Sequence, residues 1–403
     1  METGAAVREP DEAMKAMREA IDNVVIGGGP AGSMLAIRLA AAGRRVVLLE
    51  KEREAQDKVC GEFLSREAVA YLQQAGVEPR ELGACAIARV RLTSGGRTVA
   101  GRLPFTALSL SRRVLDEALL RRALEAGCEV RRGAFAERLE QKADSWAMRM
   151  RDGRTIEAAT VFLASGKHDL NAWERRGCAQ EDLIGFKMHW RLTPGQTKAA
   201  RDVMELFLFR GGYGGLALVE DEIANLCLVV RRNRLRKLGA WRELRQAICD
   251  ELPFLRERLD GATACWSKPL AISPIPYGFI ARRADGLWRV GDQAAVIPSF
   301  TGDGMSIALH SARLAAEMYM AGNSAGEYAC SLAKQLQSSM RIATVLSRAM
   351  VAAWGRMLAP SLFGLRPDAM GQIASWTRIP NDALLTAPLT SRYSQVQGSV
   401  PLG

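Results

Sequence analysis

The alternation of apolar and polar positions is most regular near the start of the chain, over residues 21–50. A β-branched run at 24–26 predicts a strand, and the alanine- and leucine-rich stretch after the following glycines predicts a helix to about residue 42. A second apolar run at 46–49 predicts another strand, which ends on Glu50. Strand, helix and strand in this order form the unit from which nucleotide-binding domains are built.

Later segments predict a second sheet and a helical end. The segments "LIGFKMHWRL", "VMELFLFRGGYGGLALVE" and "IANLCLVVRR" are typical of strands joined by turns. After residue 320 the apolar positions recur at helical spacing. Large apolar residues on the strands are expected to form core rather than a pocket. They are Met188, Trp190, Phe207 and Phe209.

The glycines after the first strand have the spacing Gly27-x-Gly29-x-x-Gly32. In such a turn the first glycine permits the tight bend, the second lets a pyrophosphate approach the backbone, and the third allows the helix to pack closely on the strand. The free N–H groups of the helix N-terminus then favour the phosphates. Glu50 can accept hydrogen bonds from ribose hydroxyls and would repel a 2′-phosphate. These features indicate a site for FAD or NAD.

A second segment, "LWRVGDQAAVIPSFTGDGMSIALHSARLAAEM", favours FAD. FAD is long enough to need a second docking point, which a segment distant in the sequence should supply. Here a predicted strand leads to Gly291-Asp292, then to a loop with Pro298, and then to the Gly-Asp-Gly sequence at 302–304, which opens a long helix. A helix N-terminus stabilises the negative charge that develops on a reduced flavin.

The two glycine segments resemble those of the FAD-dependent superfamily of para-hydroxybenzoate hydroxylase and the geranylgeranyl reductases, to which flavin-dependent halogenases are related. The resemblance covers roughly residues 20–320. It implies that Asp292 holds the ribityl or pyrophosphate end, that Pro298 lies beside the flavin ring, and that Arg112, four residues before Asp116 in a predicted amphipathic helix, reaches the cofactor. The residues assigned to FAD binding are Gly27, Gly29, Ala31, Gly32, Glu50, Lys51, Cys60, Gly61, Arg112, Gly291, Asp292, Gly302, Asp303, Gly304 and Met305.

The fold implied by the resemblance is a Rossmann-like α/β FAD-binding domain of the GR2 type with an inserted β-sheet substrate domain and C-terminal helices. The FAD-binding domain is expected to be discontinuous, because the substrate domain interrupts it. The expected division is an N-terminal tail at 1–20, the FAD-binding domain at 21–180 and 286–325, the β-rich substrate domain at 181–285, and a C-terminal helical region at 326–403.

The segment "DKVCGEFLSREAVAYLQQAGV" bears on the branch of the superfamily. Its Cys60-Gly61 pair resembles the geranylgeranyl reductase loop that approaches the flavin, which makes Cys60 a candidate residue near the ring. Glu62 falls where the halogenase loop carries a glutamate. However, the next helix contains no lysine, and the WxWxIP signature of halogenases is replaced by "GGYGGLALVE". Halogenation is therefore disfavoured.

Two kinds of flavin chemistry stay open. In one, reduced flavin captures O2 as a C4a-hydroperoxide and transfers oxygen to a lipophilic aromatic or polyketide-like secondary metabolite. In the other, it transfers hydride to a C=C bond of a prenyl or lipid substrate. We favour the monooxygenase because the tyrosine- and tryptophan-rich strand of prenyl reductases is missing; a non-catalytic flavin-binding partner or sensor is a third hypothesis. The catalytic candidates are Cys60, His189 and Pro298.

The electron donor is expected to be NAD(P)H, acting directly or through a partner flavin reductase. The sequence reads Ala164-Ser165-Gly166 where hydroxylases that bind the nicotinamide carry Asp-Gly, and a second Rossmann fingerprint is missing.

Composition narrows the remaining classes. The eight cysteines contain no CxxC pair, so neither a metal site nor a disulfide framework is expected, and a reducing, cytoplasmic setting is the default. The net charge of +11 comes from arginines in mixed-sign helices, which favours solvated faces over nucleic-acid binding. We expect no signal peptide and no transmembrane segment. Peripheral membrane contact through the C-terminal helices stays open.

Overall fold

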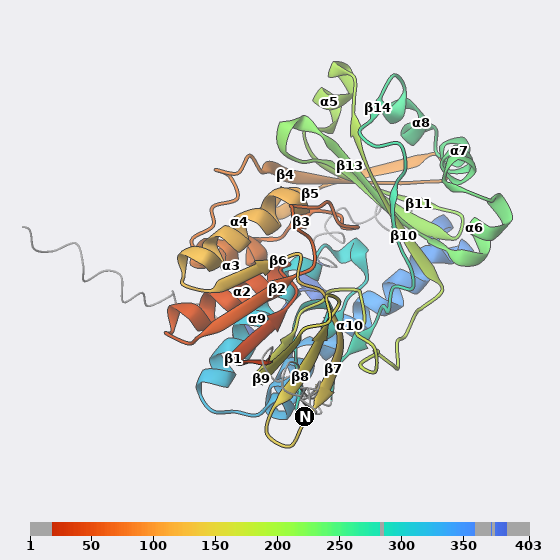
Figure 1. Ribbon diagram of the computed structural model, residues 1–403. Helices are drawn as coiled ribbons and strands as arrows, with labels where there is room; N and C mark the ends of the chain where they lie inside the picture. The colour runs from red at the N-terminus through yellow and green to blue at the C-terminus, as the bar shows by residue number, and fades with distance from the viewer. Residues whose placement is uncertain (1–17, 283–285, 359–371, 373–374, 385–403) are drawn as a thin grey trace, which may run out of the picture.

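The computed structural model describes residues 18–282, 286–358, 372 and 375–384, which form two lobes, each built on its own sheet (Figure 1). Most of the expected N-terminal tail and much of the expected C-terminal helical region lie outside the described residues. Within them, the mixed α/β architecture confirms the predicted Rossmann-like fold class.

The first lobe is built on a seven-stranded sheet with the order β6-β2-β1-β9-β8-β7, and β17 pairs with β9. β1 pairs in parallel with β2 and β9, while β8 is antiparallel to both its neighbours. The strands are β1 (Arg18–Ile26), β2 (Val46–Glu50), β6 (Glu129–Arg132), β7 (Ala136–Gln141), β8 (Trp146–Met150), β9 (Thr155–Leu163) and β17 (Trp288–Arg289).

Both faces of this sheet are covered, which explains the continuous apolar runs of β1 and β2. Val25 and Leu48 belong to a core shared with five helices, whereas Val24 and Val47 pack on the other face with Met148 of β8. The five helices are α2 (Pro30–Ala41), α3 (Arg66–Gln74), α4 (Arg112–Glu125), α9 (Gly304–Met320) and α10 (Ala325–Val351).

The second lobe is a nine-stranded sheet with the order β14-β10-β13-β12-β11-β4-β5-β3, and β15 pairs with β10. Helices α7 (Trp241–Glu251) and α8 (Pro253–Leu259) cover one face of this sheet. The side chains of Met188, Trp190, Phe207 and Phe209 are buried there, which confirms the prediction that they form core. The strands are β3 (Phe63–Leu64), β4 (Cys85–Ser94), β5 (Arg97–Ser109), β10 (Leu183–Arg191), β11 (Asp202–Phe209), β12 (Gly212–Leu218), β13 (Ala224–Arg231), β14 (Thr263–Ala264) and β15 (Leu270–Ile272).

The composition of this sheet corrects one predicted domain boundary. The sequence predicts a substrate domain at residues 181–285 and assigns residues 63–109 to the FAD-binding domain. In the structure, residues 63–109 contain β3, β4 and β5, which belong to the second sheet. β11 pairs in parallel with β4, with Leu206 opposite Leu92. Hydrophobic periodicity reveals that a segment is a strand but not which distant strand completes its ladder. The sheet of the second lobe is therefore assembled from two separate stretches of chain.

One helix, α10, connects the two lobes. α10 begins at a capping box formed by Ser324 and Glu327, and it contacts α9 and β17 of the first lobe as well as β11 and β12 of the second. The other elements are α5 (Pro194–Ala200), η1 (Glu220–Glu222), α6 (Arg232–Leu238), α7 (Trp241–Glu251), α8 (Pro253–Leu259), β16 (Phe279–Ile280), η2 (Gly291–Gln293), β18 (Ala295–Val296), η3 (Ser299–Thr301) and η4 (Asn381–Ala383).

Candidate active site

The glycine loop between β1 and α2 has the geometry that phosphate binding requires. Gly27 has a positive φ of 111°, and a Cβ on it would lie 2.4 Å from the carbonyl oxygen of Ala164. A Cβ on Gly32 would lie 1.9 Å from the carbonyl oxygen of Gly27, so the helix can approach this closely only with glycine. α2 begins without a side-chain cap, which leaves its first N–H groups available to an anion.

Arg112 lies over this loop, and its contact with the cofactor stays a prediction. A Cβ on Gly29 would meet only its guanidinium, at 3.2 Å. Asp116 orients Arg112 through two hydrogen bonds of 2.7 and 2.8 Å, while Arg113 is exposed. A fixed cation and an open helix N-terminus therefore face the same space, and both fit the pyrophosphate of FAD.

Glu50 and its neighbours lie at the end of β2. The Glu50 carboxylate accepts hydrogen bonds from the backbone N–H groups of Gly28, at 2.7 Å, and Glu52, at 2.9 Å, so it is held against the glycine loop. Lys51 is exposed and lies 3.7 Å from the Glu52 carboxylate, and Ala31 is buried in α2. Direct contacts of these residues with FAD stay predictions.

The second FAD segment places Asp292 in η2, beside Lys167. Burial alone would raise the pKa of Asp292, but the Lys167 ammonium, 2.8 Å away, holds it below the ordinary value. Arg175 donates to the backbone oxygen of Asp292 at 2.7 Å. The sequence analysis missed Lys167 and Arg175, although both follow β9 where that strand reaches the same edge of the sheet.

α9 begins within the Gly-Asp-Gly sequence, as predicted, and a turn at Gly302 precedes it. Gly302 has a φ of 75°, and Gly304 and Met305 begin the helix. Asp303 does not cap the helix; its Oδ2 accepts from Thr377 at 3.2 Å, and its Oδ1 has no hydrogen-bond partner among the described residues. Burial raises the pKa of Asp303 to about 7. Its side chain thus faces the chain around Thr377, and the helix N–H groups stay open.

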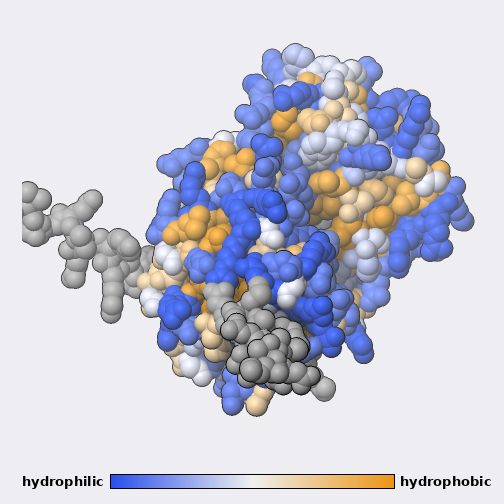
Figure 2. Space-filling model, viewed as in Figure 1, coloured by the Kyte–Doolittle hydropathy of each residue, from blue (hydrophilic) through white to orange (hydrophobic). Residues whose placement is uncertain are grey.

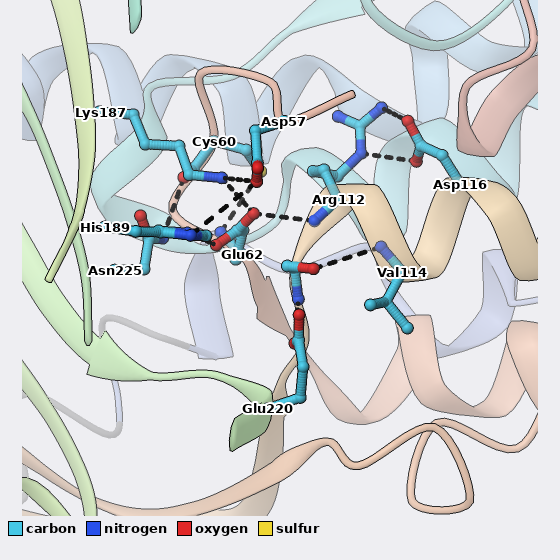
Figure 3. A network of polar contacts seen from close by, with 11 residues as sticks. Asp57, Cys60, Glu62, Arg112, Val114, Asp116, Lys187, His189, Glu220 and Asn225 are labelled. Atoms are coloured by element: carbon cyan, nitrogen blue, oxygen red, sulfur yellow. Dashed lines mark hydrogen bonds and ion pairs between the residues drawn. The ribbon is translucent and has the colours of Figure 1, made fainter. Parts of the chain in front are cut away.

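A buried ion cluster joins the loop at 57–62 to β10 of the second lobe. Figure 3 shows this cluster from close by. Glu62, fully buried at a φ of 59°, accepts from the backbone N–H of Arg112 at 2.8 Å, and it also bonds Lys187. Its other oxygen lies 2.9 Å from Nε2 of His189. Lys187 Nζ also donates to Asp57 at 3.0 Å. This cluster comprises Asp57, Glu62, Lys187 and His189.

The Lys187 ammonium pairs with both carboxylates of the cluster. Burial would lower the pKa of Lys187, but the carboxylates of Glu62 and Asp57 raise it above the ordinary value, so the ammonium is retained. Asp57, Glu62 and His189 present ligand atoms within 4.8 Å of one another, a spacing that suits a metal ion. Lys187 donates to both carboxylates and supplies the positive charge there. We therefore interpret the cluster as an ion-pair network.

Of the catalytic candidates, His189 belongs to this cluster and Cys60 adjoins it. The Sγ of Cys60 accepts from the N–H of Glu62 at 3.3 Å, and the carbonyl of Cys60 accepts from Asn225 at 3.1 Å. His189 stacks on Trp266, with the ring centroids 4.8 Å apart. The sequence analysis missed Lys187, although Lys187 and His189 alternate with buried apolar residues along β10. Period-two alternation places both on the sheet face opposite the core.

A mostly apolar cavity of about 530 Å³ lies between the sheet of the second lobe, α10 and two loops, one before β3 and one before α9. Gly61 and Gly302 line it at those loops, and Pro298 precedes η3, whose residues also line it. Strands β4, β11, β12 and β13 form one wall, with Leu206, Leu208 and Val229 among its side chains. Figure 2 shows further apolar side chains in a band across the molecule near β10 and β11.

Known proteins are similar to this chain in sequence. A family model described as an FAD binding domain matches residues 20–163. Digeranylgeranylglycerophospholipid reductase 2 of Methanopyrus kandleri is 29% identical over 74% of this chain and 76% of its own length. Menaquinone reductase of Mycolicibacterium smegmatis is 26% identical over 76% of this chain and 78% of its own length.

Solved structures share the fold. Halogenase PltM has a TM-score of 0.73 at 14% identity and covers 89% of this chain and 82% of its own. PqsL, a probable FAD-dependent monooxygenase from Pseudomonas aeruginosa, has a TM-score of 0.66 at 19% identity and covers 86% of this chain and 100% of its own. These similarities agree with the resemblance to the superfamily of para-hydroxybenzoate hydroxylase and the geranylgeranyl reductases, and the chain is an FAD-dependent oxidoreductase.

Across residues 18–282, 286–358, 372 and 375–384, every helix is too short or too polar to cross a membrane.

Proposed function

We propose that the protein reduces a C=C bond in a long lipophilic substrate, such as a prenyl chain, bound in the apolar cavity. The observation that carries this proposal is the cavity itself, whose lining is mostly apolar and which reaches the loops that carry Gly61 and Gly302. Such walls recognise an extended apolar chain by burial, at about 25 cal/mol per Å². The names of the two sequence relatives, which describe reductases of a digeranylgeranyl lipid and of menaquinone, support the same substrate class.

FAD held by the glycine loop, Arg112 and the N-terminus of α9 would, when reduced, supply the hydride for the double bond. The chain must bind the substrate, exclude water and hold the proton that completes the addition. Cys227 and Tyr213 line the cavity and can hold that proton, because burial raises the pKa of the Cys227 thiol to about 12 and raises the pKa of Tyr213. Both groups are therefore protonated at neutral pH.

The test is anaerobic turnover of the dithionite-reduced holoprotein with geranylgeranyl lipids and with menaquinone. Mass spectrometry should show a gain of two hydrogens for each reduced bond, and the flavin should be reoxidised in step with product. Reduced flavin that stays reduced in the presence of these substrates would contradict the proposal. Parallel reduction with NADH, NADPH or a flavin reductase tests the proposed electron donors.

Oxygen transfer to a lipophilic aromatic substrate is the second candidate. It is favoured by one observation: the residues lining the cavity include no carboxylic acid, which an alkene reduction could use and an oxygen transfer does not need. A dry cavity also protects a reactive oxygen species from water. Mixing reduced protein with O2 in a stopped-flow instrument distinguishes the two candidates. A transient absorbing species, with 18O from 18O2 in the product, would favour the monooxygenase.

A further inference from the structure

The large apolar side chains exposed on the described part of the chain are concentrated at the mouth of the cavity. There are six such side chains, and all except Leu124 fall between residues 345 and 376. Val345, Trp354 and Leu358 are at least half exposed and also line the cavity. Met357 precedes Leu358, and Trp376 precedes Thr377, which also lines the cavity. We call these five residues the apolar rim: Val345, Trp354, Met357, Leu358 and Trp376.

The exposed stripe of α10 that leads to the rim is cationic. Lys334, Ser338, Arg341, Val345 and Arg348 are all exposed and follow one another at spacings of three or four residues, which places them on one face of the helix. Between residues 334 and 348 this face carries three cations and no carboxylate, and the exposed Glu327 lies two turns before Lys334. Arg356, nearer the rim, pairs with Glu251 at 3.8 Å. Positive charge therefore borders the apolar rim along the helix.

We propose that this face docks on an anionic lipid bilayer, with the apolar rim inserted among the acyl chains and the α10 cations at the headgroups. Tryptophan is well suited to this boundary because its large ring is apolar while its N–H can reach water. Lysine and arginine beside a membrane surface are attracted by anionic lipids. The cavity mouth then opens toward the hydrocarbon. A lipophilic substrate can enter the cavity without crossing water, a consequence that rests on the proposed function.

Charge favours a bilayer over a second copy of this chain. A two-fold dimer formed through the same face would bring two identical surfaces together. The cations of each α10 stripe would then face those of the other copy, which opposes association. An anionic bilayer instead complements both the charge and the apolar character of the face.

The test is sedimentation of the full-length holoprotein with lipid vesicles. We expect binding to phosphatidylcholine vesicles that contain phosphatidylglycerol, and much weaker binding to phosphatidylcholine alone. Leu358→Ser should weaken binding about tenfold, because it removes one inserted apolar side chain. Leu124→Ser is the matched control, since Leu124 is a leucine of the same 50% exposure on α4 of the other lobe. Its binding should equal that of the unmodified protein.

A second pair of variants tests the electrostatic part. Lys334→Gln and Arg341→Gln should each weaken binding to the anionic vesicles about fivefold and leave binding to neutral vesicles unchanged. Absence of binding to the anionic vesicles overturns the proposal, as does equal loss in Leu358→Ser and Leu124→Ser. A concentration-dependent dimer abolished by Leu358→Ser, in protein that ignores vesicles, would make a second copy the occupant.

Vesicle binding is measured without substrate, so its outcome is independent of the catalysed reaction. Failure of alkene reduction with intact vesicle binding would refute the proposed function alone. Reduction of a detergent-dispersed substrate by protein that does not bind vesicles would refute the docking alone.

Discussion

Replacing Lys187 by methionine tests whether the buried ion cluster holds the loop at 57–62 in place. Lys187 is fully buried, and its ammonium pairs with Asp57 and with the fully buried Glu62. Without it, two carboxylates face each other with little water to screen them. Loss of one partner of a buried ion pair costs about 3–5 kcal/mol. That is a large part of the roughly 5–15 kcal/mol that stabilises a typical domain.

Two measurements follow the consequence in Lys187→Met. Urea unfolding should show the loss of stability, and the loss should shrink at acid pH because protonation of a carboxylate relieves the repulsion. Flavin fluorescence should show weaker FAD binding, because Glu62 also holds the backbone N–H of Arg112, and Arg112 lies over Gly29. In the unmodified protein the pKa of Lys187 is raised, so its stabilising contribution is complete at neutral pH and is lost only as the pH rises through that value.

Arg258→Met is the matched control. Arg258 of α8 forms an ion pair of 2.7 Å with Glu205. Glu205 is buried on β11, which belongs to the same sheet as Lys187. Glu205 alternates along β11 with Met204 and Leu206, which line the cavity, so it lies on the opposite face. This variant should also lose stability but keep its FAD affinity. If the two variants bind FAD equally well, the assignment of a positioning role to the cluster is refuted.

Three further outcomes are expected. Gly29→Val should give folded protein without flavin, because the added side chain meets Arg112 and fills the phosphate space; stoichiometric yellow flavin would contradict the site. Gly215→Leu should slow turnover of long prenyl substrates at unchanged FAD content, since a Cβ there has only ordinary 3.5 Å contacts and a longer side chain fills the cavity; unchanged kinetics would remove the cavity from substrate binding. Burial raises the pKa of Asp303 from 3.8 to about 7, so between these pH values the folded protein binds more protons than the unfolded chain. The free energy of unfolding should therefore fall as the pH rises from 3.8 to about 7 and level off above that pH. Urea unfolding of Asp303→Asn across this range should lack that decrease; an identical pH dependence in both proteins would show that Asp303 ionises normally.

The FAD segments could be predicted from the sequence because their constraints are local. Gly27 and Gly302 occupy positive φ values that other residues rarely adopt, so the turns are visible in the residue types themselves. The helix that follows each turn is encoded by its own run of apolar residues. For the same reason the orientation of Arg112 by Asp116 was predictable, since a separation of four residues places both on one face of α4.

What the sequence by itself determined was therefore the cofactor class, the two glycine turns and the strands with their buried faces. Only the tertiary structure decided which strands share a sheet, because β4 meets β11 more than 100 residues later. It also brought Lys187 to Glu62 across 125 residues, and it enclosed the cavity between β11–β13 and α10. Periodicity specifies which face of an element is buried. The partner of that face is chosen by packing between distant segments, and no local pattern records that choice.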